Sequence, residues 1–116
     1  MSESGTSPAG AMMRAAAALV AISGVLHLIA SATSGFAAEG VRLAPPGLIY
    51  LIAAFGLFRG ARWLAFLMFP ALLIGAVLSF GFSGGGGAVP GWAYAAISAA
   101  DALAAGCMFF ALWPTR

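Results

Sequence analysis

The chain has 116 residues, of which 63% are hydrophobic and 7% charged, and its formal net charge is +2. A soluble domain needs far more polar surface than this composition supplies, so it is excluded and an integral membrane protein is predicted. The five basic residues are arginines scattered along the chain, which excludes a nucleic-acid partner because no patch could neutralise a run of phosphates. Cys107 is the single cysteine, so an internal disulfide is excluded.

The chain begins with a small, polar segment, MSESGTSPAG, that cannot bury enough apolar surface to fold alone. We expect residues 1–12 to be a disordered tail and residues 13–116 to form one all-α domain, a four-helix transmembrane bundle. A helix of about 20 apolar residues crosses the hydrocarbon core of a bilayer. By this criterion the predicted helices are residues 13–33, 43–59, 63–82 and 91–113.

Two of these segments leave room for alternatives. The segment at 43–59 has 16 uncharged residues between Arg42 and Arg59, so it needs local thinning of the bilayer or snorkelling of its arginines. The segment at 13–33 is followed by small residues from Ala30 onward and could instead be a cleaved signal peptide. Cleavage would leave three helices with the same orientation.

The arginines predict the orientation of the four spans. Arg14, Arg59, Arg62 and Arg116 fall on one side of the membrane and Arg42 alone on the other. Positive charge in short loops is retained on the cytoplasmic side, so both termini are expected there. The expected location is the cytoplasmic (inner) membrane of a bacterium.

Small residues four positions apart mark the faces through which helices pack in a bilayer. The fourth predicted helix has two such stripes, so it is expected to be touched from two sides. The neighbours would be two helices of the bundle, or one helix and a second copy of the chain. The stripes are Ala96, Ala100 and Ala104, and Ser98, Ala102 and Gly106.

Polar residues gather in the outer half of the predicted bundle. Taking 1.5 Å per residue, His27 lies about 10 Å and Asp101 about 15 Å below the outer end of their helices, so the two could pair. Serines share the helix face of His27, and Ser98 and Tyr94 share that of Asp101. The candidate site, in the outer half and open to the exterior, consists of His27, Asp101, Ser23, Ser31, Ser98 and Tyr94.

Two interpretations of this polar site stand side by side. A hydrogen bond between His27 and Asp101 would close the bundle and require no activity. Alternatively, the two residues handle protons or bind a ligand. Placing an ionisable residue at the bilayer centre costs on the order of 3 kcal/mol, so the residues that are found there often have a function.

These interpretations lead to two hypotheses of function. The first is an accessory or scaffold subunit that associates with a larger membrane complex; the second is a small proton-coupled transporter or ligand-binding membrane protein, acting through His27 and Asp101. No cofactor or metal is predicted, since one histidine is too few for the usual axial ligation of haem b. No catalytic residue is assigned, because Ser23 and Ser31 lie on the same helix as His27 rather than facing it.

Overall fold

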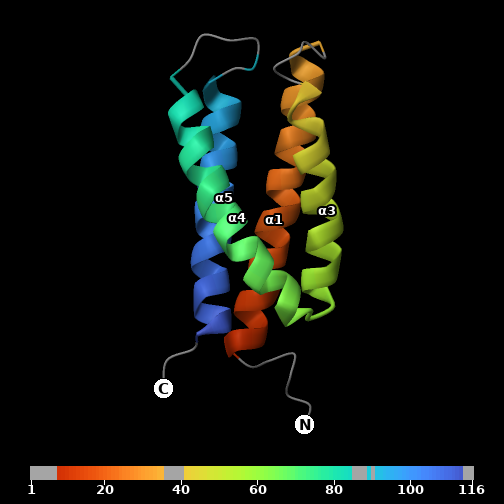
Figure 1. Ribbon diagram of the computed structural model, residues 1–116, viewed down its shortest axis with the longest axis vertical. Coiled ribbons are helices and arrows are strands. Elements are labelled where there is room, and N and C mark those ends of the chain that lie inside the picture. Colours follow the sequence, from red (N-terminus) through yellow and green to blue (C-terminus); the bar gives the residue numbers. More distant parts are fainter. Residues whose placement is uncertain (1–7, 36–40, 85–88, 90, 114–116) are drawn as a thin grey trace.

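The computed structural model describes residues 8–35, 41–84, 89 and 91–113, and within these ranges it holds four helices and no strand. The prediction of an all-helical fold is therefore confirmed for the described part of the chain. The helices are α1 (Pro8–Thr33), α3 (Ala44–Phe58), α4 (Arg62–Phe82) and α5 (Gly91–Leu112) (Figure 1).

Helix α1 begins five residues before its expected start at residue 13. Residues 8–12, expected to belong to a disordered tail, are therefore helical, whereas residues 1–7 lie outside the described ranges. Proline is favoured in a first helical turn, and Pro8 is followed by residues such as Ala11 and Met12 that form helices readily. The other helix bounds fall within one residue of those expected.

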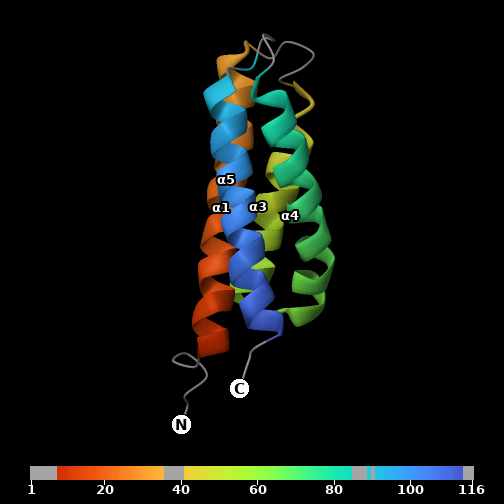
Figure 2. The same cartoon turned by 90° about the vertical axis from the view of Figure 1, so that its left-hand side faces the viewer.

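The four helices run side by side, in the spatial order α3, α1, α5, α4 (Figures 1 and 2). Helix α1 packs along both α3 and α5, and α4 packs along α5, whereas α3 and α4 touch only slightly. One end of the bundle contains the turn at Arg59 and is called the Arg59 end; the other, where α3 begins after Arg42, is called the Arg42 end. Helix α4 lies close to α3 at the Arg59 end and crosses towards α5 at the Arg42 end (Figure 1).

The outer surface of the bundle is strongly apolar. Ile52, Val77 and Phe80 are between 72% and 73% exposed, and many other large apolar side chains also face outward. Helices α1, α4 and α5 are long and apolar enough to cross a membrane, whereas α3 is a shorter apolar helix of 15 residues, about 22 Å long. Such a surface suits contact with lipid acyl chains and is unfavourable in water.

The interior is built largely from small residues, as is expected of helices that pack in lipid. Ala100 and Ala104 are buried on α5, in the part of the stripe that faces its neighbours, whereas Ala102 and Gly106 of the second stripe are exposed. Most of the apolar core fills the half of the bundle nearer the Arg59 end, where side chains such as Leu57 and Met108 are fully buried.

Helices α1 and α3 lie in close contact at a pair of glycines, Gly24 and Gly47. A Cβ atom placed on Gly47 would lie 2.9 Å from the Cβ of His27 and 3.0 Å from the carbonyl oxygen of Gly24. A Cβ on Gly24 would in turn lie 2.9 Å from the carbonyl oxygen of Gly47. These atoms are two backbone carbonyl oxygens and a Cβ, which cannot move independently of their helices. Neither glycine can therefore be replaced by a larger residue unless the helices separate.

The substitution Gly47→Ala is therefore expected to lower the free energy of unfolding by about 1–3 kcal/mol, the usual cost of overpacking. The measurement is thermal unfolding of the purified protein in detergent, followed by circular dichroism. Gly106→Ala is the matched control, because no atom lies within 4 Å of the added Cβ, and it should leave stability equal or slightly higher. Equal stability of the two variants would contradict the close contact between α1 and α3.

Candidate functional site

Among the residues that the structure describes, the most buried ionisable group is the carboxylate of Asp101 on α5, which is 0% exposed. Its Oδ1 accepts a hydrogen bond from the hydroxyl of Ser23 on α1 at 2.5 Å, and its Oδ2 accepts one from the hydroxyl of Tyr50 on α3 at 3.4 Å. Helix α4 reaches the same point through Gly75, where an added Cβ would lie 2.6 Å from Oδ2. One carboxylate is thus in contact with all four helices.

His27 is oriented by two of the same neighbours. Its Nδ1 lies 2.7 Å from the carbonyl oxygen of Ser23. Because a carbonyl oxygen can only accept, Nδ1 carries the hydrogen, and Nε2 of the neutral ring is a hydrogen-bond acceptor. The ring also packs edge-on against Tyr50, with 5.1 Å between the ring centroids.

The structure does not join His27 directly to Asp101. Within the described residues, the hydrogen bonds of Asp101 go to Ser23 and Tyr50, and that of His27 goes to the backbone of Ser23. The two residues share neighbours instead of forming the pair that their similar depth suggested. Asp101 is consequently part of the packed interior, while His27 is left with one ring nitrogen for another partner.

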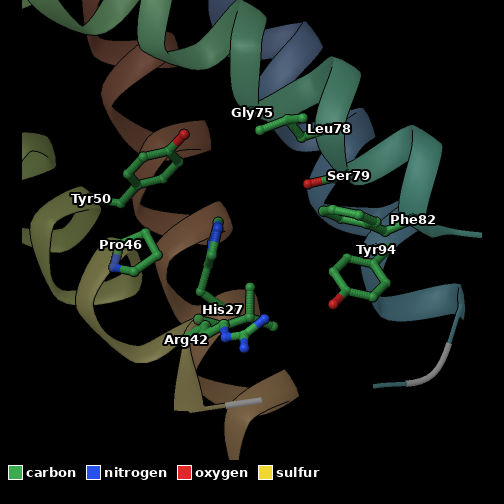
Figure 3. Close-up of a pocket in the computed structure, with 10 residues that line it drawn as sticks. His27, Arg42, Pro46, Tyr50, Gly75, Leu78, Ser79, Phe82 and Tyr94 are labelled. Carbon is green, nitrogen blue, oxygen red and sulfur yellow. The ribbon is translucent and has the colours of Figure 1, made fainter. Parts of the chain in front are cut away.

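A pocket of about 610 Å³ lies between α3 and α4 at the Arg42 end of the bundle (Figure 3). His27 of α1 and Tyr94 of α5 contribute to its walls as well. Because α3 and α4 touch only slightly, the pocket lies on the open side of the bundle. Its lining residues are His27, Arg42, Leu43, Pro46, Tyr50, Gly75, Leu78, Ser79, Phe82 and Tyr94.

Two buried polar groups face this pocket from opposite walls, the ring of His27 and the hydroxyl of Ser79 (Figure 3). Their side chains are only 6% and 8% exposed, respectively. Neither His27 Nε2 nor Ser79 Oγ has a hydrogen-bond partner among the residues that the structure describes, and both atoms open onto the pocket. By contrast, the hydroxyl of Ser83, one turn further along, donates to the carbonyl of Phe80 at 2.7 Å.

The mouth of the pocket carries a positive charge. Arg42 is exposed, and it forms neither an ion pair nor a hydrogen bond with any residue that the structure describes. It lies just before the start of α3, where Pro45 and Pro46 occupy the first turn. The N-terminal end of a helix carries partial positive charge, which adds to that of the guanidinium.

The other residues of the predicted site lie in different surroundings. Tyr94 lines the pocket and packs against Phe82, with 5.5 Å between ring centroids. Ser98 donates to the carbonyl of Ala76 on α4 at 2.8 Å and so joins α5 to α4. Ser31 is buried, and its Oγ finds no hydrogen-bond partner within the described ranges. The structure thus brings His27, Tyr94, Ser23 and Asp101 to the pocket or directly behind it.

Four residues of this region were missing from the predicted site. Tyr50 and Ser79 fall in the same half of the bundle by a count of residues, which is a signal that could have included them. Gly75 belongs to a stripe of small residues on α4, and only the structure shows that it makes room for Asp101. Arg42 was used in the sequence analysis only to predict the orientation of the helices in the membrane.

The fold and the pocket define a helical protein with an apolar exterior suited to a membrane and a polar-tipped pocket between two of its helices. Comparison with known proteins finds no family model that matches the chain, and no curated protein or solved structure with significant similarity. The function is therefore inferred from the site itself.

The contact between Gly75 and Asp101 predicts that a side chain at position 75 of α4 lowers the stability of the protein. Gly75→Ala places a Cβ 2.6 Å from Asp101 Oδ2 and 3.0 Å from the Tyr50 hydroxyl, so the carboxylate must shift or α4 must move away. We expect the free energy of unfolding to fall by about 1–3 kcal/mol. Gly81→Ala on the same helix meets no atom within 4 Å and should be neutral or slightly stabilising in the same thermal unfolding assay. A stable Gly75→Ala variant would show that this contact is not restrictive.

Two serines on one helix are expected to respond in opposite ways to removal of the hydroxyl. Ser23→Ala removes a donor from a buried carboxylate and should cost about 1–3 kcal/mol. Ser31→Ala removes a buried hydroxyl without a described partner, so it should be neutral or stabilising. Thermal unfolding of both variants in the same detergent tests this difference, and a greater loss for Ser31→Ala would reverse the assignment.

Proposed function

We propose that the protein is a four-span integral protein of a bacterial cytoplasmic membrane that binds a small amphipathic molecule in the pocket between α3 and α4. The observation that carries the proposal is the pair of polar atoms, His27 Nε2 and Ser79 Oγ, that open onto facing walls of that pocket from side chains only 6% and 8% exposed, without a partner among the described residues. An apolar pocket with a few convergent polar groups is the usual form of a small-molecule site.

The lack of partners for these groups supports a bound molecule rather than a purely structural role. Polar groups that line a largely apolar pocket and have no protein partner are the groups that fix the orientation of a bound molecule. The hydroxyls of Ser23, Ser34, Ser83 and Ser98 all donate to protein acceptors. A ligand, or water in its absence, would supply the missing partners of His27 and Ser79.

The arrangement of arginines supports the proposed orientation. Arg14, Arg59 and Arg62 belong to the Arg59 end, and Arg42 is the only arginine described at the opposite end. With both termini cytoplasmic, the pocket lies in the outer half of the membrane. Helix α3, at 15 residues, would cross with the help of local thinning of the bilayer or snorkelling of its flanking arginines.

An accessory role in a larger complex remains a second candidate, favoured by one observation. A shallow apolar groove runs between α4 and α5 on the outer surface, and no atom lies within 4 Å of a Cβ placed on Gly106 there. Such a groove could receive a transmembrane helix of a partner protein. Co-purification of one stoichiometric membrane partner, lost in Gly106→Leu, would support this role.

Filling the pocket is the direct test of ligand binding. Ser79→Leu replaces a pocket hydroxyl with a larger apolar side chain and should remove a small molecule that is bound to the wild-type protein. The measurement is native mass spectrometry of the protein, extracted together with its surrounding lipid in polymer-bound discs. The expected result is a specific adduct on the wild type that is absent from Ser79→Leu.

Ser83→Leu is the matched control, because the Ser83 hydroxyl is already bonded to its own helix and does not line the pocket. This variant should retain the adduct. A wild-type protein without any adduct, or equal occupancy of wild type and Ser79→Leu, would contradict the proposal.

A further inference from the structure

The charge at the pocket restricts the ligands that it can accept. Arg42 is the only charged side chain among the described lining residues, and it lies without an ion-pair partner among them. Asp101 is fully buried and does not line the pocket. Together with the N-terminal end of α3, Arg42 gives the mouth a positive potential that favours an anionic group.

The hydrogen-bonding capacity of the inner walls restricts the ligand further. Since Nδ1 of His27 donates to the Ser23 carbonyl, Nε2 of the neutral ring can only accept. The Ser79 hydroxyl can donate or accept. A ligand that satisfies Nε2 must therefore include a donor, such as a hydroxyl or an amide N–H. A molecule that carries only carbonyl acceptors, such as a quinone, would place its lone pair against that of Nε2.

The remaining walls of the pocket indicate that the middle part of the ligand is apolar, and the position of the pocket indicates that the ligand enters from the bilayer. Leu43, Pro46, Leu78 and Phe82 line the space around the two polar groups. Leu78 and Phe82 are also more than half exposed on the outer surface, beside the gap where α3 and α4 fail to meet. In a membrane this gap faces the acyl chains, so a molecule dissolved in the outer leaflet can reach the pocket from the side.

We infer that the ligand is a membrane-partitioning organic acid with a second, hydrogen-bond-donating group: its anion binds Arg42, its apolar part lies against the pocket walls, and its donor binds His27 Nε2, with Ser79 Oγ as a further hydrogen-bonding partner on the facing wall. This inference rests on the proposed function, because it names the ligand class of the same pocket. A cationic ligand is disfavoured by the positive charge of Arg42.

The inference is tested with a panel of matched probes on the full-length protein in lipid nanodiscs. The probes are ω-hydroxydecanoic acid, its methyl ester, which lacks the anion, and decanoic acid, which lacks the donor. Isothermal titration calorimetry, corrected with empty nanodiscs, gives the Kd of each. The hydroxy acid should bind at least about tenfold more tightly than either of the other two probes. The methyl ester lacks the anion that binds Arg42, and decanoic acid lacks the donor that binds His27 Nε2.

Two arginine variants assign the anion to its partner. Arg42→Gln should raise the Kd of the hydroxy acid by about tenfold and leave that of the methyl ester unchanged. Arg59→Gln, at the opposite end of the bundle, is the matched control and should leave both values unchanged, because Arg59 is distant from the pocket and contacts the Phe55 ring.

The outcomes separate this inference from the proposed function. If acid and ester bind equally and Arg42→Gln changes neither, while Ser79→Leu still abolishes binding, the pocket binds ligands and the acid class is wrong. If decanoic acid binds as tightly as the hydroxy acid, the requirement for a donor is wrong. If none of the probes binds the wild type while the wild type still carries an adduct that Ser79→Leu lacks, the ligand class alone is overturned. If there is neither probe binding nor an adduct, or if Ser79→Leu binds the probes as the wild type does, both the ligand class and the proposed function are overturned.

Discussion

The arrangement of the four helices depends on one buried carboxylate. A charge or a strongly polar group within an apolar bundle is costly unless hydrogen-bond donors surround it. Asp101 on α5 receives those donors from α1 and α3, through Ser23 and Tyr50, and α4 can approach it only because position 75 is a glycine. Moving α1 or α3 away would remove a donor from the carboxylate, and moving α4 closer would bring its backbone into collision with it.

The same contacts prepare the pocket. Ser23 uses its hydroxyl for Asp101 and its carbonyl for His27 Nδ1, and Tyr50 uses its hydroxyl for Asp101 and its ring for the imidazole. The hydroxyls of Ser23 and Tyr50 are therefore bonded to Asp101, whereas Nε2 of His27 remains open to the pocket. A structural role for Asp101 and a binding role for His27 are thus compatible, although the sequence presented them as alternatives for one pair.

The sequence predicted the helices well and the site only in part, for a physical reason. Hydropathy and length decide where apolar helices form in such a chain, and the four helices match the expected segments closely, apart from the earlier start of α1 at Pro8. Counting residues gives depth along a helix, which correctly placed polar residues in one half of the bundle. It does not give the order of helices or their rotation, so it could not distinguish a direct contact of His27 with Asp101 from contacts shared through Ser23.

The open side of the bundle follows from how α4 is held at its two ends. At the Arg59 end a short turn joins α4 to α3, and they pack so closely that a Cβ on Gly56 would lie 2.6 Å from Leu64 Cδ2. Further along, the Ser98 hydroxyl binds the Ala76 carbonyl and holds α4 against α5 instead. Since α4 cannot remain beside both neighbours, the space between it and α3 widens towards the Arg42 end. Ser98, which does not itself line the pocket, therefore helps to keep that pocket open.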